Sequence, residues 1–194
     1  MVEGDNILFL LSSTGQYPSG VIENLPNKTY TIHELSDRYF QFIKTRLKFI
    51  DKEDDDIEYI SNMDFKFDKK YDTIIIGQGL EFIPTKDRIK LLNNISKLLN
   101  TNGTLLISHL NKNSWYYIHW LKNITPSQIQ NKGVFKPITS KEVKDNIYNL
   151  DLENEKSITL LPKVKYKGRE ITNSFLQIFG AVKLYKYIKR DSCD

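Results

Sequence analysis

The stretch Tyr71-Asp-Thr-Ile-Ile-Ile-Gly77 decides the fold of this 194-residue chain. Its centre is an unbroken run of β-branched residues, and a glycine closes it. Such a run packs well on a pleated surface and offers no polar face to water, so it predicts a strand buried on both faces. Strands of that kind are typical of parallel sheets that are covered by helices on both sides.

The residues after this strand have the pattern of a helix and then of a second buried strand. Pro84-Thr85 is expected to begin the helix, Asn102-Gly103 to end it, and Thr104–Ser108 to form the strand. An apolar stripe at helical spacing supports the helix, and it consists of Ile89, Leu92, Ile95 and Leu99.

The residues before Tyr71 show the same alternation of strand and helix. Three short segments rich in apolar or β-branched residues predict strands, namely Ile7–Leu11, Thr29–His33 and Ile57–Ile60. Ser36 is an N-cap candidate for a helix with the apolar stripe Phe40, Ile43, Leu47 and Ile50. The acidic run Asp51–Asp56 is expected to be an exposed loop.

This alternation indicates an α/β fold with a parallel sheet and a layer of helices on each face. No linker divides the chain, so residues 1–194 are expected to form a single domain. Ligands of such sheets bind beyond the carboxyl ends of the strands. The functional residues are therefore expected directly after the strands.

The second half of the chain is less regular. A helix rich in aromatic side chains is expected at Ser114–Lys122, a loop at Thr125–Pro137, and a short helix at Thr139–Asn149. Two late strands are expected at Ser157–Val164 and Ala181–Ile188.

Composition and charge favour an ordinary soluble protein of the cytoplasm. The formal net charge is +4, from 28 basic and 24 acidic residues spread along the chain, so nucleic-acid binding is not expected. The apolar runs are far shorter than the roughly 20 residues that cross a membrane, so no membrane partner is expected. The lone Cys193 lacks His or Cys neighbours at metal-ligand spacing, and no metal site is expected.

Two segments in the middle of the chain resemble the class I S-adenosylmethionine-dependent methyltransferases. Tyr71–Pro84 (YDTIIIGQGLEFIP) resembles the family's fourth motif, in which an aspartate opens the fourth strand and a phrase like Leu-Glu-His-Ile-Pro follows. Leu91–Ser108 (LLNNISKLLNTNGTLLIS) is similar to the helix, turn and fifth strand that come next. The resemblance implies a Rossmann-like three-layer sandwich, with a mostly parallel seven-stranded sheet that ends in an antiparallel hairpin.

The resemblance also implies an S-adenosylmethionine site after the first strand, where the family has the pattern acid-x-Gly-x-Gly-x-Gly. Those glycines let the backbone approach the cofactor closely. In this chain Phe9 stands at the position of the acid, and Leu11 and Ser13 stand at the first two glycines. Ser12, Ser13 and the retained Gly15 are the expected cofactor contacts in this loop.

Other cofactor contacts are implied after later strands. Glu34 follows the second strand, where the family has an acid that accepts hydrogen bonds from both ribose hydroxyls, although a first-turn acid that favours the next helix is the alternative. Asp64 or Asn62 falls where the family has an adenine contact. Gln78, after the fourth strand, is expected to contact the cofactor or to form a turn, whereas Asp72 is expected to serve structure.

Methyl transfer requires mainly that the nucleophile be held in line with the methyl group, and a general base helps when that nucleophile is a hydroxyl. His109 directly follows the fifth expected strand and is the candidate catalytic base, whereas His33 and His119 are expected to be structural. Four aromatic residues are expected either to wall an acceptor pocket or to pack in the core or on a partner: Trp115, Tyr116, Tyr117 and Trp120.

Two functions stay open at this point. The first is an S-adenosylmethionine-dependent methyltransferase that acts on a small-molecule acceptor, which Glu34 and the Asp72–Pro84 stretch favour. The second is a methyltransferase-fold protein that has lost catalysis and serves as a binding or scaffolding subunit, either with other partners or beside an active methyltransferase. The departures at Phe9, Leu11 and Ser13 favour the second.

Overall fold

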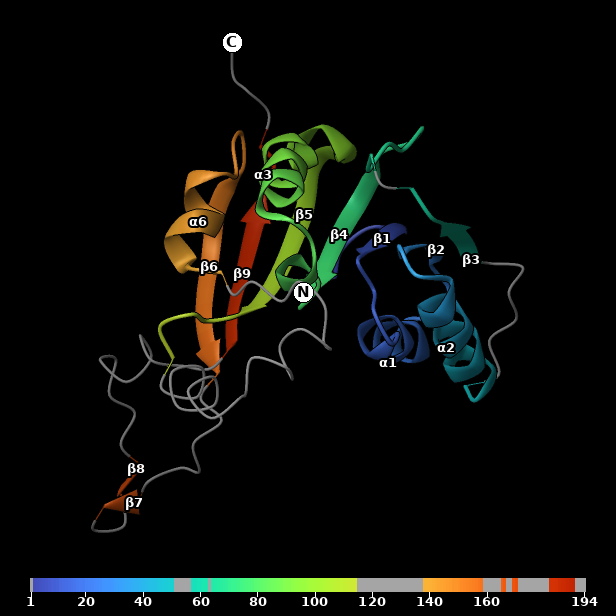
Figure 1. Cartoon of the computed structure of the whole chain (residues 1–194), viewed down its shortest axis with the longest axis horizontal. Coiled ribbons are helices and arrows are strands. Elements are labelled where there is room, and N and C mark those ends of the chain that lie inside the picture. The colour runs from blue at the N-terminus through green and yellow to red at the C-terminus, as the bar shows by residue number, and fades with distance from the viewer. Residues whose placement is uncertain are drawn as a thin grey trace.

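The computed structural model of the chain describes residues 2–50, 57–62, 64–114, 138–158, 165–166, 169–170 and 182–190. Its middle layer is a seven-stranded sheet in the order β3-β2-β1-β4-β5-β9-β6 (Figure 1). β1 to β5 pair in parallel, and β9 is antiparallel to both of its neighbours. The strands are β1 (Asn6–Leu10), β2 (Thr29–His33), β3 (Ile57–Ile60), β4 (Tyr71–Gly77), β5 (Leu99–Leu110), β6 (Asp151–Ile158) and β9 (Val182–Ile188).

β1 and β4 lie at the centre of the sheet and are buried on both faces. They pair in register, with Ile7 opposite Thr73 and Leu8 opposite Ile74. Leu8 and Ile74 belong to one apolar cluster, while Ile7 and Ile75 belong to the cluster on the opposite face. The strand predicted from the Tyr71–Gly77 stretch is therefore confirmed, with the same bounds.

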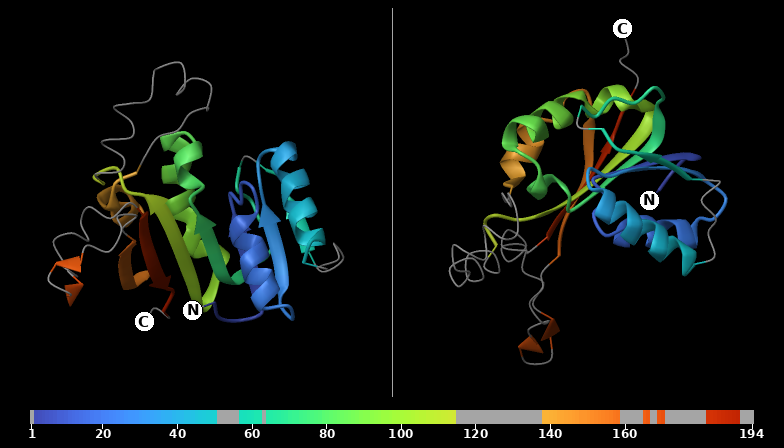
Figure 2. Two further views of the ribbon diagram at one scale, coloured as in Figure 1. Left: turned by 90° about the horizontal axis from the view of Figure 1, so that it is seen from below. Right: turned by 45° about the vertical axis from the view of Figure 1, so that its right-hand side comes forward.

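Helices cover both faces of the sheet (Figure 2). α1 (Gln16–Asn24) and α2 (Asp37–Lys48) pack on one face, and α3 (Thr85–Asn94) and α6 (Ser140–Asp145) pack on the other. Each helix adds buried side chains to the cluster on its face: Ile22 and Ile43 on the first, Leu92 and Val143 on the second. The expected α/β three-layer sandwich, with its mostly parallel sheet and antiparallel hairpin, is confirmed.

The sequence did not indicate α1, which follows the first strand. Pro18 and Gly20 lower the helix propensity of this segment. Pro18 is tolerated because it lies in the first turn, where a backbone N–H has no acceptor within the helix.

The late strand expected at Ser157–Val164 begins earlier, because β6 spans Asp151–Ile158. The sequence signal was weak, since β6 is an edge strand and residues 151–156 are exposed. Charged side chains on such an edge hinder pairing with other chains and remove the apolar pattern of a strand. Residues 159–164 lie outside the described residues.

Asn102-Gly103 does not end a helix, contrary to expectation. α3 ends at Asn94, a 3-10 helix (η3, Ile95–Leu98) follows, and Asn102 lies inside β5 with a left-handed φ of 61°. The pairing of β5 with β4 shifts register around this point, so the turn residues form an irregularity within the strand.

Other expectations have partial outcomes. The helix expected at Thr139–Asn149 is shorter, because α6 ends at Asp145, and Thr139 caps it by accepting a hydrogen bond from the Glu142 N–H at 3.1 Å. The aromatic helix and the loop expected between Trp115 and Pro137 lie outside the described residues, as do His119 and Cys193. Lys165–Tyr166 (β7) and Arg169–Glu170 (β8) form a separate two-stranded sheet.

Asp72 joins the beginnings of the central strands, which confirms its expected structural role. One carboxylate oxygen accepts hydrogen bonds from the N–H groups of Asp5 (2.9 Å) and Asn6 (3.0 Å), and the other accepts one from the Asn100 side chain (2.7 Å). Burial raises the pKa of Asp72, but the hydrogen bonds outweigh it and hold the pKa below its ordinary value.

Asp72→Ala is expected to lower the free energy of unfolding by about 2–4 kcal/mol near neutral pH, because three donors lose a charged acceptor. The pKa of Asp72 is lower in the folded state, so its contribution is present above the unfolded-state pKa and is lost as the pH falls through the folded-state value. Urea denaturation at about pH 7 and about pH 2.5 should show a smaller difference from wild type at the lower pH.

The exposed Asp68 provides the matched control, and Asp68→Ala should leave stability near that of wild type at both pH values. A deficit of Asp72→Ala that stayed the same at low pH would contradict this role of the ionised carboxylate.

Candidate functional site

The carboxyl ends of β1, β2 and β4 meet at one edge of the sheet. Some of the cofactor-binding residues predicted from the sequence lie at this edge. A cavity of about 170 Å³ opens there. Its lining includes Leu11 and Ser13 after β1, Glu34 after β2, Gly79 after β4, and Tyr39 on α2. Of the expected cofactor contacts, Ser13 and Glu34 are thus brought together.

The loop after β1 keeps a backbone shape that suits glycine. Leu11 and Ser13 have φ values of 55° and 51°, in the left-handed region, although neither is glycine. Gly15 has φ 76°, and a Cβ there would lie 2.8 Å from Ile43 Cγ1, so no larger residue fits. The loop therefore has a backbone conformation that glycine adopts readily, with two non-glycine residues at left-handed positions.

The loops after β1 and β4 approach each other closely at Leu11 and Gly79. A Cβ added to Gly79 would lie 2.4 Å from Leu11 Cβ and 2.6 Å from the Leu11 carbonyl oxygen, which means that the two residues are in direct contact. Leu11 is only 5% exposed and belongs to the main apolar cluster. Sequence reasoning identified Leu11 as a departure from the pattern of the family that the chain resembles, and the structure places it in the wall of the cavity.

Glu34 binds the backbone on both sides of the cleft. Its Oε2 accepts a hydrogen bond from the Ser13 N–H (2.5 Å), and its Oε1 accepts from the N–H groups of Leu35 (2.8 Å) and Ser36 (3.2 Å). Burial raises the pKa of Glu34, and these hydrogen bonds oppose that shift. The carboxylate therefore fixes the β1 loop against the end of β2 and also favours the beginning of α2.

Ser12 and Gln78 serve the loops in which they lie. Ser12 is buried, and its N–H donates to the His33 carbonyl at 3.2 Å. Gln78 has a left-handed φ of 55°, and its N–H donates to the Ser108 carbonyl at 3.0 Å, which is the turn role that the sequence left open. Neither side chain is part of the described lining of the cavity.

Asp64 and Asn62 also lie outside that lining. Asp64 is exposed and pairs with Lys66 at 3.7 Å, while the Asn62 amide closes a turn through two hydrogen bonds with the backbone of Lys66. The Asn62 carbonyl lies 2.9 Å from His33 Nε2, beside the end of β2, but an adenine contact at Asp64 has no support from the described cavity.

His109 lies inside the protein, within β5. It is fully buried, its ring stacks on Tyr185 with 5.6 Å between centroids, and its Nδ1 lies 3.0 Å from the Leu110 carbonyl. Burial lowers the pKa of His109 to about 4, so the ring is neutral at neutral pH. It does not belong to the described lining of the cavity, and a role as catalytic base would require an acceptor to reach it by another route. His33 is packed, as expected, against Phe65 and Phe67.

Sequence reasoning missed Glu81, which lies in the short 3-10 helix η2 (Leu80–Phe82) after β4. Glu81 is fully buried, and its Oε1 accepts a hydrogen bond from the Leu110 N–H at 2.5 Å. Burial raises the pKa of Glu81 to about 7. Nearby, the buried Arg88 pairs with Glu142 at 2.7 Å and joins α3 to α6. The signal for Glu81 in the sequence was a single acidic residue within an otherwise apolar segment.

No protein-family model matches the chain, and no curated protein matches it. Solved structures do match over nearly its whole length. A putative methyltransferase of Haloferax volcanii, in complex with the Trm112 methyltransferase activator, has a TM-score of 0.66 at 12% identity and covers 100% of this chain and 86% of its own.

Two bacterial methyltransferases are similar to the same degree. An S-adenosylmethionine-dependent methyltransferase of Clostridium acetobutylicum has a TM-score of 0.67 at 12% identity, covering 98% of this chain and 86% of its own. The N-methyltransferase NodS of Bradyrhizobium japonicum, in complex with S-adenosyl-L-homocysteine, has a TM-score of 0.64 at 12% identity, covering 96% and 79%. The chain therefore has the class I S-adenosylmethionine-dependent methyltransferase fold.

None of the helices in the described part of the chain combines the length and the apolar character that a membrane span requires. In the same part of the chain, no group of three or more His, Cys, Asp or Glu side chains is placed to hold a metal ion.

Glycine substitutions at Leu11 and Ser13 are expected to have opposite effects on stability. Ser13→Gly should stabilise the protein by up to about 1 kcal/mol, because the left-handed conformation disfavours serine and the side chain is only half buried. Leu11→Gly should destabilise it by about 1–3 kcal/mol, because lost burial exceeds the relief of backbone strain. Chemical denaturation of both variants measures the two values, and destabilisation by Ser13→Gly would argue against a strained loop.

Glu81 is expected to lower stability as the pH rises towards neutrality. Its pKa is raised from 4.5 to about 7, so the stability of the neutral form is fully present below 4.5 and is lost as the pH rises through about 7. Glu81→Gln should remove this slope, worth at most about 3 kcal/mol. Parallel unfolding curves of wild type and variant from about pH 4.5 to 8 provide the test, and a constant difference between them would contradict it.

Proposed function

We propose that this chain is a methyltransferase-fold protein that does not bind S-adenosylmethionine and acts as a binding subunit for another protein. The observation that carries the proposal is the close approach of Leu11 to Gly79, which leaves a cavity of only about 170 Å³ where the fold would hold its cofactor. A protein that keeps the sheet but has so little room in the cleft is suited to present its surface.

The size and polarity of the cavity support this proposal. Its volume of about 170 Å³ is below the roughly 300 Å³ at which pockets for drug-sized ligands begin. S-adenosylmethionine is a ligand of that larger class and carries a charged sulfonium and amino acid group. The position that the family gives to an acid before the loop is taken by Phe9, which is 1% exposed and stacks with Tyr30. The residues present therefore do not fit the cofactor.

Glu34 gives further support. A carboxylate that serves the ribose hydroxyls needs its oxygens turned to the ligand, whereas both oxygens of Glu34 already accept backbone hydrogen bonds. These bonds hold the closed loop in place, which is a structural role. The Haloferax methyltransferase in complex with an activator offers a precedent for assembly by this fold.

A second function, methyl transfer to a small-molecule acceptor, is favoured by a different observation. Leu11 and Ser13 have left-handed φ values, which glycine adopts most readily, and Glu34 directly follows β2. In this alternative the Leu11 side chain leaves Gly79 before the cofactor binds. The burial of His109 then leaves the reaction without a general base among the residues expected for it.

Isothermal titration calorimetry with S-adenosylmethionine and S-adenosylhomocysteine distinguishes the two functions. Wild type is expected to show no saturable heat up to about 1 mM of either ligand, because the cleft is too small. Leu11→Gly combined with Ser13→Gly removes the side chain that blocks the cleft and is the variant in which any residual affinity should appear.

Glu34→Gln serves as the control for specific binding. Saturable one-to-one binding by wild type that Glu34→Gln weakens would refute the non-catalytic function and support the methyltransferase. Binding that is unaffected by Glu34→Gln would place the ligand elsewhere on the surface and leave the closed cleft as proposed.

A further inference from the structure

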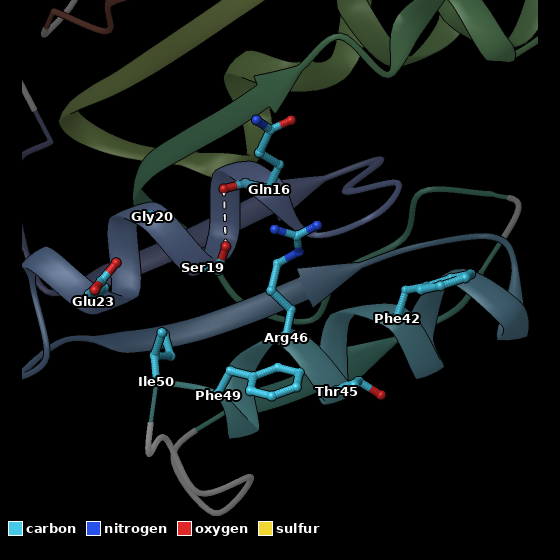
Figure 3. A pocket seen from close by; sticks show the side chains of 9 residues that line it. All are labelled: Gln16, Ser19, Gly20, Glu23, Phe42, Thr45, Arg46, Phe49 and Ile50. Atoms are coloured by element: carbon cyan, nitrogen blue, oxygen red, sulfur yellow. Dashed lines mark hydrogen bonds between the residues drawn. The ribbon is translucent and has the colours of Figure 1, made fainter.

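A hollow of about 540 Å³ lies between α1 and α2 (Figure 3). Its lining includes a row of residues on α1, namely Gln16, Ser19, Gly20 and Glu23, and a second row along α2 and its C-cap, namely Phe42, Thr45, Arg46 and Phe49. Both rows have the spacing i, i+3, i+4, i+7, which places their members on one face of each helix. We name this hollow the α1/α2 groove.

The α2 side of the groove carries apolar side chains in addition to those that pack against the sheet. α2 already buries Phe40, Ile43 and Leu47 against the sheet. Phe42 and Phe49 lie on its outer side and are 48% and 84% exposed. Large aromatic side chains that gather on an exposed concave surface mark an interaction site more often than singly scattered ones do.

The α1 side of the groove leaves room for a backbone to approach. Ser19 is small, and a Cβ added to Gly20 would meet no atom within 4 Å. Small residues on one wall and aromatic residues on the other suit a third helix, which packs at about 8–10 Å from its neighbours. The shape of the groove therefore fits a helix that lies along α1 and α2.

The charges in the groove indicate what this helix carries. Arg46 projects from α2 towards Gln16 (Figure 3), and its Nε donates to the Thr14 carbonyl at 3.2 Å. Among the described residues, Arg46 forms no ion pair with an acidic side chain. In the same part of the chain, Glu23 on the opposite row forms no ion pair with a basic side chain. α2 as a whole carries four cations against the single acid Asp37, and the cations are Arg38, Lys44, Arg46 and Lys48.

We propose that the α1/α2 groove binds an amphipathic helix of a partner protein, with its apolar face on Phe42 and Phe49 and a carboxylate opposite Arg46. This rests on the proposed function, because it names the surface through which a binding subunit would act. An anionic membrane fits less well, since the aromatic side chains line a hollow rather than a face that could lie in the plane of a bilayer.

The test uses the full chain and two synthetic amphipathic peptides of about 18 residues, long enough to form a helix. Both carry leucines at i, i+3, i+4 and i+7, and they differ only in having glutamate or lysine beside the apolar stripe. The glutamate peptide is expected to bind with shifts in ¹⁵N–¹H NMR spectra confined to α1 and α2, and at least about tenfold more tightly than the lysine peptide.

Substitutions should change this binding in a defined way. Phe49→Ala should weaken the glutamate peptide about tenfold with little loss of stability, because Phe49 is 84% exposed. Arg46→Glu should reverse the preference towards the lysine peptide. Tyr148→Ala is the matched control, since Tyr148 is 53% exposed but lies after α6, away from the groove, and it should change nothing.

Three results would overturn the inference. They are equal binding of both peptides, shifts that map outside α1 and α2, and no binding at about 1 mM combined with Phe49-dependent sedimentation on phosphatidylglycerol vesicles. Calorimetry with S-adenosylmethionine is independent of these readouts. Cofactor binding together with selective peptide binding would refute the proposed function and keep the groove, while the absence of both would refute the groove alone.

Discussion

The carboxylate of Asp72 fixes the beginnings of three neighbouring strands, and the rest of the sheet is built on them. It accepts hydrogen bonds from the amides before and within β1 and from the Asn100 side chain in β5, while Asp72 itself belongs to β4. The segment before β1 lies directly against Asp72, because a Cβ on Gly4 would lie 2.1 Å from Asp72 Cβ. With their beginnings fixed, parallel strands end at one edge, and the loops that follow them must meet there.

At that opposite edge, a second carboxylate and one leucine decide what the fold can do. Glu34 holds the β1 loop by its amide, and Leu11 occupies the space that this loop encloses with Gly79. The backbone of the loop has a shape that glycines would allow, although Leu11 and Ser13 occupy its left-handed positions. Under the proposed function, the side chains of this loop leave the sheet undisturbed and leave only a small cavity beside it.

The outer side of α2 offers a surface to which another protein could bind. The helix buries one apolar face against β1 and β2 and exposes Phe42 and Phe49 on another. The second face adds little to the core of the domain, since Phe49 is 84% exposed and Phe42 is 48% exposed. The closed cleft and the exposed face are separate observations from different residues, and both suit a protein whose function is to bind another.

The sequence by itself determined the architecture. The β-branched run of β4 and the strands at Thr29–His33 and Ile57–Ile60 have the predicted bounds, because buried parallel strands require continuous apolar segments. It also indicated where the loop after β1 differs from the glycine pattern of the family that the chain resembles. α1 escaped prediction and β6 was expected to begin later than it does, since their stability comes from neighbours rather than from their own propensity. Only the tertiary structure decided that Leu11 reaches Gly79, that Glu34 is engaged by backbone amides, and that Glu81 is buried. These facts depend on contacts between segments distant in the chain, which no local pattern of residues records.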